Sequence, residues 1–263
     1  MTFNKIALYS FNTAHLSTLD DIQGLIPDAC KIKSLSELDH SFDLLIIIGG
    51  DGSMIRCAQY TTLFEIPIIG INTGKIGFLT DIKTDEITQH LLAITSGNFI
   101  LEERSLLECR LNGVYAGACI NEVTLTRNKG LQMIHYDLYL NHQLLHTHRA
   151  DGMIISTPTG STAYALSAGG PILHPQIKGI LLQPLCSHKV NTKPLVASLT
   201  DYIRIIYHPQ KGSDAAIYID GNTCFELNDT CTIDIHKSKQ SLKLIHPASF
   251  DFYQTLKTKL GWH

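Results

Sequence analysis

The stretch Asp43-Leu-Leu-Ile-Ile-Ile-Gly-Gly-Asp-Gly-Ser53 decides the fold of this chain. Its first half is a continuous run of apolar side chains, which is typical of a parallel strand buried on both faces. The two glycines end the strand, and a helical pattern of apolar residues follows from Ser53 to about Leu63. A strand that turns through glycines into a helix is the basic repeat of an α/β sheet.

The rest of the first hundred residues alternates in the same way. Strands are predicted at residues 5–10 and 67–71, and helices at residues 18–25 and 85–96. Strand and helix in this order predict a parallel sheet with helices on its faces. We therefore expect an α/β domain over residues 1–98.

The pattern changes near Asn98. From there to about residue 245, short segments of alternating polarity are separated by turn signals, and Asn112-Gly113 is typical of a hairpin. Strands are predicted at residues 106–111, 114–120, 136–140, 144–148, 201–207, 216–219 and 230–236. This predicts a β-rich second domain over residues 99–246, interrupted by a short helix at 161–168. Residues 249–260 have the spacing of a last helix.

Composition and charge narrow the class of protein. The chain has 263 residues and a net charge of −3, with no run of basic residues, so we expect no nucleic-acid partner. The longest strongly apolar run, residues 44–48, is too short to span a bilayer, and the N-terminus lacks the features of a secretion signal. We therefore expect no membrane partner and a cytoplasmic protein. Seven scattered cysteines without a C-x-x-C pair predict reduced thiols.

The glycine-rich turn at residues 49–53 is the first candidate site. Ligands of open α/β sheets bind at the carboxyl ends of the strands, and a helix N-terminus attracts phosphate. Asp51 repels a phosphate, so its presence indicates another role, either taking a proton from an attacking hydroxyl or helping to hold Mg²⁺. No Gly-Lys-Ser/Thr or G-x-G-x-x-G pattern is present, which disfavours a Walker A loop and a hydride-transferring Rossmann enzyme. The structural alternative is a tight turn capped by Asp51 or Ser53.

Two shorter polar segments are further candidates. Asn72-Thr-Gly-Lys-Ile-Gly-Phe-Leu79 follows the next predicted strand, and Phe78 in it either faces a ligand ring or fills the core. In the β-rich domain, Glu122 can accept hydrogen bonds from neighbouring ribose hydroxyls, and Asn121 can both donate and accept. A solvated strand end is the alternative explanation for the Asn-Glu pair.

The most specific segment is Asp151-Gly-Met-Ile-Ile-Ser-Thr-Pro-Thr-Gly-Ser-Thr-Ala-Tyr164, followed by Ser167-Ala-Gly-Gly-Pro171. A strand runs into a turn crowded with glycine and small hydroxyl residues, and then into a helix. That density supplies backbone and hydroxyl donors for a polar ligand. Tyr164 adds a flat apolar face with a polar tip.

Taken in order, these segments and Asp220-Gly221 resemble the NAD kinase family over nearly the whole chain. The G-G-D-G turn is shared with lipid kinases and phosphofructokinases, whereas the segment from Asp151 to Pro171 is more specific. The resemblance implies an α/β domain, a β-sandwich domain, and a tail, residues 247–263, that packs back onto the first domain. It also implies phosphoryl transfer from ATP or polyphosphate to the 2′-hydroxyl of the adenosine ribose of NAD, giving NADP.

The resemblance also implies a role for each site residue. Asp51 is expected to be the catalytic base, and Asn121 and Glu122 to hold the adenosine moiety and its ribose. Asp151 is expected to face the nicotinamide half. The other expected nucleotide-binding residues are Gly50, Gly52 and Ser53 on the phosphate path and Phe78, Thr162, Ala163, Tyr164 and Ser167 around the adenine. The family acts as a homodimer or homotetramer whose site a neighbouring subunit completes.

Several alternatives stay open at this point. A lipid kinase would use the same G-G-D-G turn, and an NAD(H) sensor would keep the fold but is expected to lack Asp51. His142, His146 and His148 could suggest a metal site, although no cysteine or carboxylate completes it and a surface hairpin is favoured. Phosphoryl transfer calls for Mg²⁺ or another divalent cation, for which no protein ligand is assigned. ATP and polyphosphate, NAD and NADH, and dimer and tetramer are not distinguished.

Overall fold

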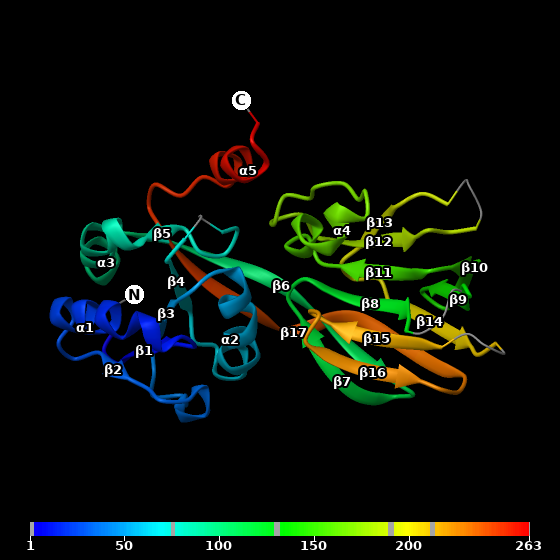
Figure 1. The fold of residues 1–263 in the computed structure, drawn as a ribbon, viewed down its shortest axis with the longest axis horizontal. Coiled ribbons are helices and arrows are strands. Elements are labelled where there is room, and N and C mark those ends of the chain that lie inside the picture. Colours follow the sequence, from blue (N-terminus) through cyan, green and yellow to red (C-terminus); the bar gives the residue numbers. More distant parts are fainter. Residues whose placement is uncertain (1–2, 75–76, 129–131, 189–191, 211–213, 263) are drawn as a thin grey trace. The chain divides into compact units, whose positions relative to one another are not determined.

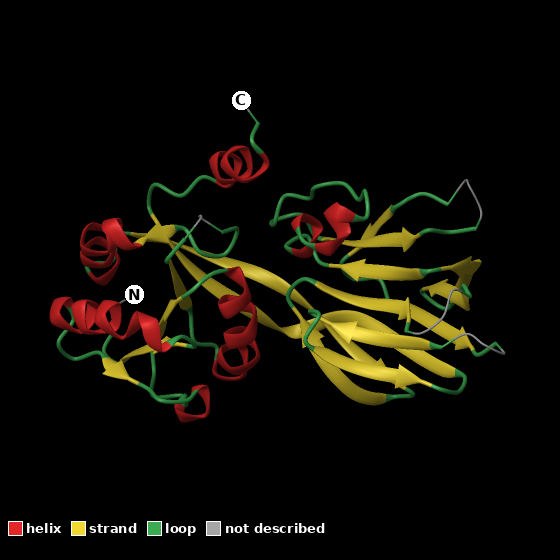
Figure 2. Ribbon diagram, viewed as in Figure 1, coloured by secondary structure: helices red, strands yellow, loops and turns green. Residues whose placement is uncertain are grey.

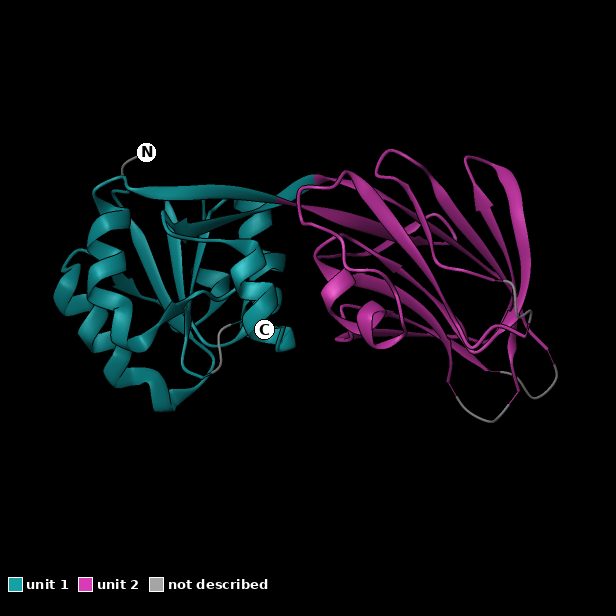
Figure 3. Cartoon of the chain, turned by 90° about the horizontal axis from the view of Figure 1, so that it is seen from above, with its two compact units in different colours: residues 1–103, 240–263 teal, residues 104–239 magenta. Residues whose placement is uncertain are grey.

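The computed structural model describes residues 3–74, 77–128, 132–188, 192–210 and 214–262 (Figure 1). The chain forms two compact units, Met1–Glu103 with Gln240–His263, and Arg104–Lys239 (Figure 3). These limits differ by a few residues from those expected from the sequence, because two long strands run from one unit into the other. The domain limits at 98/99 and 246/247 therefore stay a prediction.

The first unit is built on parallel strands. Strand β3 (Leu44–Ile48) pairs with β1 (Ile6–Ser10) and β4 (Ile68–Asn72), and the short strands β2 (Cys30–Lys31) and β5 (Ile82–Lys83) extend the sheet beside β1 and β4. Every residue of β3 is buried, which confirms the prediction from its apolar run. Strand and helix alternate here as predicted.

Helices cover both faces of this sheet (Figure 2). Helices α1 (Leu16–Leu25) and α3 (Ile87–Thr95) pack through Ile22 and Leu91 on alternate side chains of the strands. Helix α2 (Asp51–Phe64) lies against β3 and β4 and buries Met54 and Cys57. Short 3-10 turns occupy Thr13–His15, Leu35–Glu37 and Thr84–Glu86.

The tail returns to the first unit. Strand β17 (Cys231–Pro247) pairs Leu244 in parallel with Ile68 of β4. Helix α5 (Phe252–Leu260) follows; it starts at Asp251, whose side chain accepts the backbone N–H groups of residues 253 and 254, and it ends at Gly261 with a positive φ of 66°. A helix over nearly these residues was predicted from the spacing.

The second unit is a sandwich of two sheets. One sheet is wholly antiparallel, in the order β13 (Leu195–Ser198), β12 (Gly179–Leu185), β11 (Gly152–Ser156), β8 (Glu122–Arg127), β15 (Ala215–Ile219), β16 (Thr223–Leu227). The other contains β10 (Gln143–Ala150), β9 (Ile134–Leu140), β14 (Ile203–His208), the first part of β17, the second part of β6 (Phe99–Leu111), and β7 (Val114–Cys119). One core cluster contains inward side chains of both sheets. The α/β plus β-sandwich fold class is confirmed.

The outer face of the antiparallel sheet carries a short helical segment. A 3-10 turn, Gly160–Thr162, leads into helix α4 (Tyr164–Ser167), and Ala165 packs with Ile154 and Leu181 of the sheet. The helix predicted at 161–168 is therefore present as two short pieces. All seven cysteines are free thiols. Among the helices that the structure describes, none is long and apolar enough to cross a membrane.

Candidate functional site

Asp51 is the first residue of helix α2, two residues earlier than the helix start predicted from the sequence. The helix cap is Gly50, so neither Asp51 nor Ser53 caps the helix with its side chain. The Asp51 carboxylate instead accepts hydrogen bonds from the backbone N–H groups of Phe78 (2.8 Å) and Leu79 (2.9 Å) and from Oγ1 of Thr80 (3.2 Å). It thereby ties the loop after β4 to the start of α2.

Gly77 and Thr80 make this contact possible. A Cβ atom on Gly77 would overlap the carboxylate of Asp51. The hydroxyl of the buried Thr80 also accepts from Nδ2 of Asn72 at 2.8 Å, and the Thr80 carbonyl accepts the Gly77 N–H at 2.9 Å. Residues 77–80, which we call the Asp51 loop, are thus fixed at both ends. Residues 75 and 76 lie outside the described residues.

The other predicted residues of this unit surround the start of α2. Gly50 and Gly52 are exposed, and a Cβ atom on either would meet no other atom within 4 Å. Ser53 is half-buried. Phe78 is also half-buried; its ring lies 6.4 Å from that of Phe252 in α5, so it is partly a packing residue. A helix N-terminus attracts anions, so the start of α2 suits a phosphate.

In the second unit, Asn121 lies in the connection between β7 and β8, and Glu122 is the first residue of β8; we call this pair the Asn-Glu turn. The carboxylate of Asp220 accepts the N–H groups of Ile120 (2.8 Å), Asn121 (2.8 Å) and Glu122 (3.1 Å). Asp220 itself has a left-handed backbone with φ 48°. Although three N–H donors act in the opposite direction, burial raises the pKa of Asp220. One carboxylate therefore fixes the whole Asn-Glu turn.

Glu122 is buried, and its Oε2 atom has no hydrogen-bond partner among the described residues. Burial, together with the charge of Asp220, raises the pKa of Glu122 to about 7. A buried acceptor without a partner costs about 1–3 kcal/mol, more for a charged group, so such an atom calls for an explanation. A hydroxyl-bearing ligand would supply the missing donor.

The hydroxyl-rich turn packs directly on Asn121. The Asn121 carbonyl accepts the Thr157 N–H (2.8 Å) and the Ser156 hydroxyl (3.1 Å), and a Cβ atom on Gly160 would overlap the Asn121 backbone. The glycine is therefore needed for close approach. Beyond it, the predicted residues Thr162 and Ala163 are half-buried, whereas Tyr164 and Ser167 are exposed. The structure thus brings the 157–164 segment and the Asn-Glu turn together.

Asp151 is not brought to this turn. It precedes β11, whereas Ser156, which pairs with Glu122, is the last residue of that strand. Five residues of strand separate the two positions, roughly 16 Å at ~3.3 Å per residue. Within its own unit, Asp151 lies 3.5 Å from the guanidinium of Arg127.

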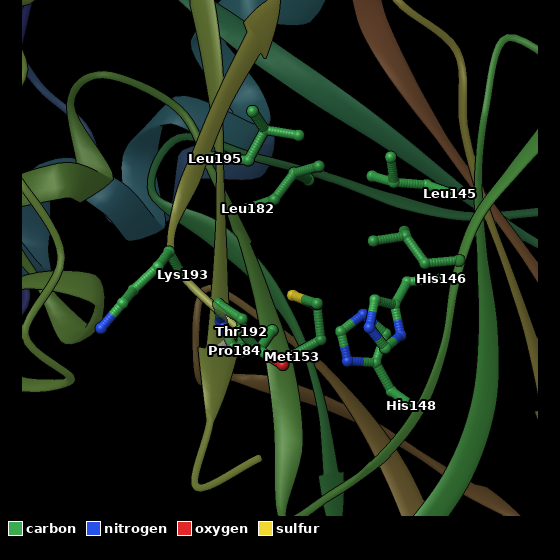
Figure 4. Close-up of a pocket in the computed structure, with 10 residues that line it drawn as sticks. Leu145, His146, His148, Met153, Leu182, Pro184, Thr192, Lys193 and Leu195 are labelled. Carbon is green, nitrogen blue, oxygen red and sulfur yellow. The ribbon is translucent and has the colours of Figure 1, made fainter. Parts of the chain in front are cut away.

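A separate cavity of about 240 Å³ lies between the edge strands of the two sheets and contains none of the predicted site residues. Figure 4 shows Leu182 and Leu195 on one side of it, and Leu145 with His146 and His148 on the other. The two imidazoles stack at 4.3 Å, and His148 stacks in turn on Tyr136 at 5.0 Å. No group of three His, Cys, Asp or Glu in the described part of the chain could hold a metal ion. Ring stacking thus accounts for this histidine pair.

Two family models match the chain. The model of the ATP-NAD kinase N-terminal domain matches residues 27–99, and that of the C-terminal domain matches residues 120–247. The chain belongs to the NAD kinase family. An NAD kinase of Azotobacter vinelandii is 36% identical over 253 residues, covering 94% of this chain and 86% of the relative. One of Legionella pneumophila is 40% identical over 230 residues, covering 86% and 78%.

Solved structures agree on the fold. Yeast NADH kinase complexed with NADH has a TM-score of 0.86 at 21% identity and covers all of this chain and 89% of its own. An Archaeoglobus fulgidus NAD kinase in complex with ATP has a TM-score of 0.79 at 24% identity, covering 98% of both chains. The prediction that this chain is an NAD kinase is confirmed. Membership of this family also decides against the lipid-kinase alternative.

Two residues of this NAD kinase architecture lie outside the segments predicted as candidate sites or have no predicted role: Thr80 completes the Asp51 loop, and Asp220 holds the Asn-Glu turn. Gly77 lies in the predicted segment 72–79, but its close approach to Asp51 was not predicted. The Asp220-Gly221 pair was noted only as part of the resemblance to the family, and no role followed from it. Contacts between positions 99 residues apart, such as Asp220 and Asn121, leave no local signal in one sequence.

Proposed function

We propose that ATP donates the phosphoryl group, that the 2′-hydroxyl of the adenosine ribose of NAD accepts it, and that Asp51 is the base. The hydroxyl proton passes to the carboxylate, an O–P bond forms to the γ-phosphorus, and the bond to the bridging oxygen breaks, releasing ADP. The family description and the Archaeoglobus relative solved with ATP support ATP over polyphosphate. Gly50, Gly52 and Ser53 offer the phosphate path.

The hydrogen bonds of Asp51 leave room for this role. An ionised carboxylate has about four lone-pair sites, and three are used by the Asp51 loop. The third donor is the Thr80 hydroxyl, which can rotate towards another acceptor. One or two sites therefore remain for the hydroxyl of a substrate.

The observation that best supports the ribose of NAD as phosphoryl acceptor concerns buried Glu122. Its Oε2 atom has no hydrogen-bond partner among the described residues. A ribose hydroxyl is a fitting donor, and Asn121 beside it can bind the nucleoside. The exposed ring of Tyr164 supports a stacking role against the nucleoside, with Thr162, Ala163 and Ser167 beside it and Phe78 as the remaining adenine contact.

The test is the kinetics of Glu122→Gln in an NADP-formation assay with ATP or polyphosphate as donor. Loss of a charged hydrogen-bond partner costs about 1.5–3 kcal/mol, so the KM for NAD should rise at least tenfold while that for ATP changes little. Glu226→Gln, on the exposed side of β16, is the matched control. An equal rise of both KM values would contradict the assignment of Glu122. Faster turnover with polyphosphate than with ATP would identify polyphosphate as the donor.

Mg²⁺ is proposed to arrive with the phosphates of ATP, whose oxygens are the kind of ligand that this cation prefers. The metal neutralises phosphate charge during transfer. Activity should vanish in EDTA and return with Mg²⁺ or Mn²⁺. Full turnover in metal-free buffer would refute the requirement.

We also propose a cytoplasmic homodimer or homotetramer in which a neighbouring subunit brings Asp151 to the nicotinamide half. The distance between Asp151 and the Asn-Glu turn within one chain supports this. Open sheet edges favour association, and the edge strands β10 and β13 carry the exposed apolar residues Leu144, Leu145, Leu195 and Val196. Light scattering at assay concentration is the test, and a fully active monomer would overturn the proposal.

A further inference from the structure

A buried histidine in the first unit lies outside the residues of the proposed site. His246, near the end of β17, lies between two carboxylates: Nδ1 is 2.8 Å from Oδ2 of Asp81, and Nε2 is 3.1 Å from Oε2 of Glu102. The imidazole is 2% exposed, and the two carboxylates are 11% and 9% exposed. The ring of Phe250 stacks on the imidazole at 4.0 Å. We call His246, Asp81 and Glu102 the His246 clamp.

A protonated imidazole places one positive charge between the two carboxylates of this clamp, whereas a neutral imidazole leaves their negative charges without any compensation from the ring. Burial disfavours the charged ring, but hydrogen bonds to Asp81 and Glu102 outweigh it and raise the pKa of His246. Asp81, just before β5, and Glu102, on β6, are the charged groups that act on the ring. Deprotonation would leave two buried carboxylates facing a neutral ring, which is unfavourable at this depth.

The clamp is joined to the proposed reacting carboxylate through the chain itself. Asp81 directly follows Thr80, whose hydroxyl donates to Asp51 and whose carbonyl accepts the Gly77 N–H. Holding Asp81 therefore holds the end of the Asp51 loop. Glu102 faces the other side of the imidazole, on a strand outside that loop, so the two carboxylates of the clamp differ in their connection to Asp51.

We propose that His246 is a positioning residue for the reaction: through Asp81 it keeps the Asp51 loop, and with it the Asp51 carboxylate, in the geometry needed for transfer. The proposal rests on the proposed role of Asp51. It makes turnover depend on the protonation of a residue that touches neither substrate.

The direction of the pH effect follows from the raised pKa. A histidine whose pKa is higher in the folded protein stabilises its surroundings fully below the ordinary value of 6.5 and loses this effect as the pH rises through the raised value. The value of kcat should therefore fall on the alkaline side as the clamp opens. The fall should coincide with the titration of the His246 ring.

Two matched substitutions separate positioning from stability alone. Asp81→Asn and Glu102→Gln each remove one charge from the clamp while keeping an acceptor oxygen. Both should lower the melting temperature, and both should move the alkaline fall of kcat to lower pH, since each carboxylate raises the pKa of His246. Only Asp81→Asn should also lower kcat below that fall, by about tenfold, because a small misplacement of a reacting group is costly. Glu102→Gln should stay within about twofold of the unchanged enzyme.

The experiment measures kcat from pH 6 to pH 10, roughly spanning the titration range of a raised histidine, and follows the ring proton of His246 by NMR in the same buffers. If both variants lose stability equally and neither moves the alkaline fall, the clamp is only structural and the proposal is overturned. If a variant does not fold, the test uses the unchanged enzyme alone. The proposal is overturned if the alkaline fall of kcat and the titration of the His246 ring differ by more than about one pH unit. Full activity of Asp51→Asn would instead refute the proposed base, and leave the NMR titration unchanged.

Discussion

Asp51 in the first unit and Asp220 in the second each hold a neighbouring loop through the hydrogen bonds of one carboxylate. The two differ in whether their hydrogen-bond donors can move away. Each accepts three hydrogen bonds from a neighbouring loop. All three donors to Asp220 are backbone N–H groups, which cannot turn away. One donor to Asp51 is the hydroxyl of Thr80, which can. If Asp51 is the base, as proposed, the number of hydrogen bonds does not separate a structural carboxylate from a reactive one, and the freedom of the donors is the feature that differs between the two.

The largest effect that separates the two is expected for Asp51→Asn. Removing the proposed base should lower kcat by at least ~10², while NAD binding stays within a few fold. The amide would also turn an NH₂ group towards a backbone N–H of the Asp51 loop, so some loss of stability is expected. Thr80→Val is the control, because it loosens the same loop and keeps the carboxylate. NAD binding is measured by calorimetry, and NADP formation is measured on the same preparation. If Asp51→Asn keeps more than a tenth of the original kcat, Asp51 is not the base.

The contact between Gly77 and the Asp51 carboxylate offers a second test of the comparison between Asp51 and Asp220. Gly77→Ala places a methyl group where the Asp51 carboxylate lies, so the loop or the carboxylate must move. We expect kcat to fall by roughly tenfold or more. Gly24→Ala, in helix α1, where a Cβ atom meets nothing within 4 Å, is the matched control and should leave kcat unchanged. Equal activity of the two variants would show that the position of the Asp51 loop is unimportant.

Asp220→Asn should act on stability and binding rather than on turnover. An amide cannot accept from three N–H groups in this geometry, and a buried N–H without a partner costs about 1–3 kcal/mol. We expect a lower melting temperature and a KM for NAD raised several fold, with kcat at saturating NAD nearly unchanged. A hundredfold loss of kcat would give Asp220 a role like that proposed for Asp51, and would remove the distinction between the two carboxylates.

The smallest effect is a pH dependence next to Asp220. The pKa of Glu122 is raised to about 7, so its carboxylate is mostly protonated at pH 6 and mostly ionised at pH 8. If the ionised form accepts the ribose hydroxyl, NAD affinity should increase severalfold from pH 6 to pH 8. Calorimetry across this range should find the increase in the unchanged protein and none in Glu122→Gln. The same trend in the variant would assign it to another group.

Local patterns predicted the parts of the fold that are held locally. The apolar run of β3 and the spacing of α5 each sit within one short window, and both were found where expected. Strand β12 was missed because Pro184 interrupts it; Pro184 pairs opposite Met153 in the sheet although it has no N–H to donate. The second half of β17 was missed because residues 237–241 include no apolar side chain, although exposed and buried positions still alternate at Lys237, Ser238 and Lys239.

The proposed site was predictable only as separate motifs. The sequence indicates Asp51 through its glycines and Glu122 through its Asn-Glu pair, but the partners of these carboxylates come from distant positions. Thr80 follows Asp51 by 29 residues, and Asp220 follows Asn121 by 99 residues. His246 shows the limit most clearly, since it meets Asp81 across 165 residues and no pattern around it announces the contact.

Because β6 and β17 each run from one unit into the other, they also set the order in which the two units can fold during synthesis. The second unit, Arg104–Lys239, is one uninterrupted segment, whereas the first unit needs residues on both sides of it. During synthesis at roughly 5–20 residues per second, the second unit can fold as soon as it emerges from the ribosome. The first must wait for Leu244 to join β4 and for His246 to meet Asp81. A nascent chain stalled before Leu244 would therefore contain a folded β-sandwich and a first-unit sheet that still lacks the end of β17.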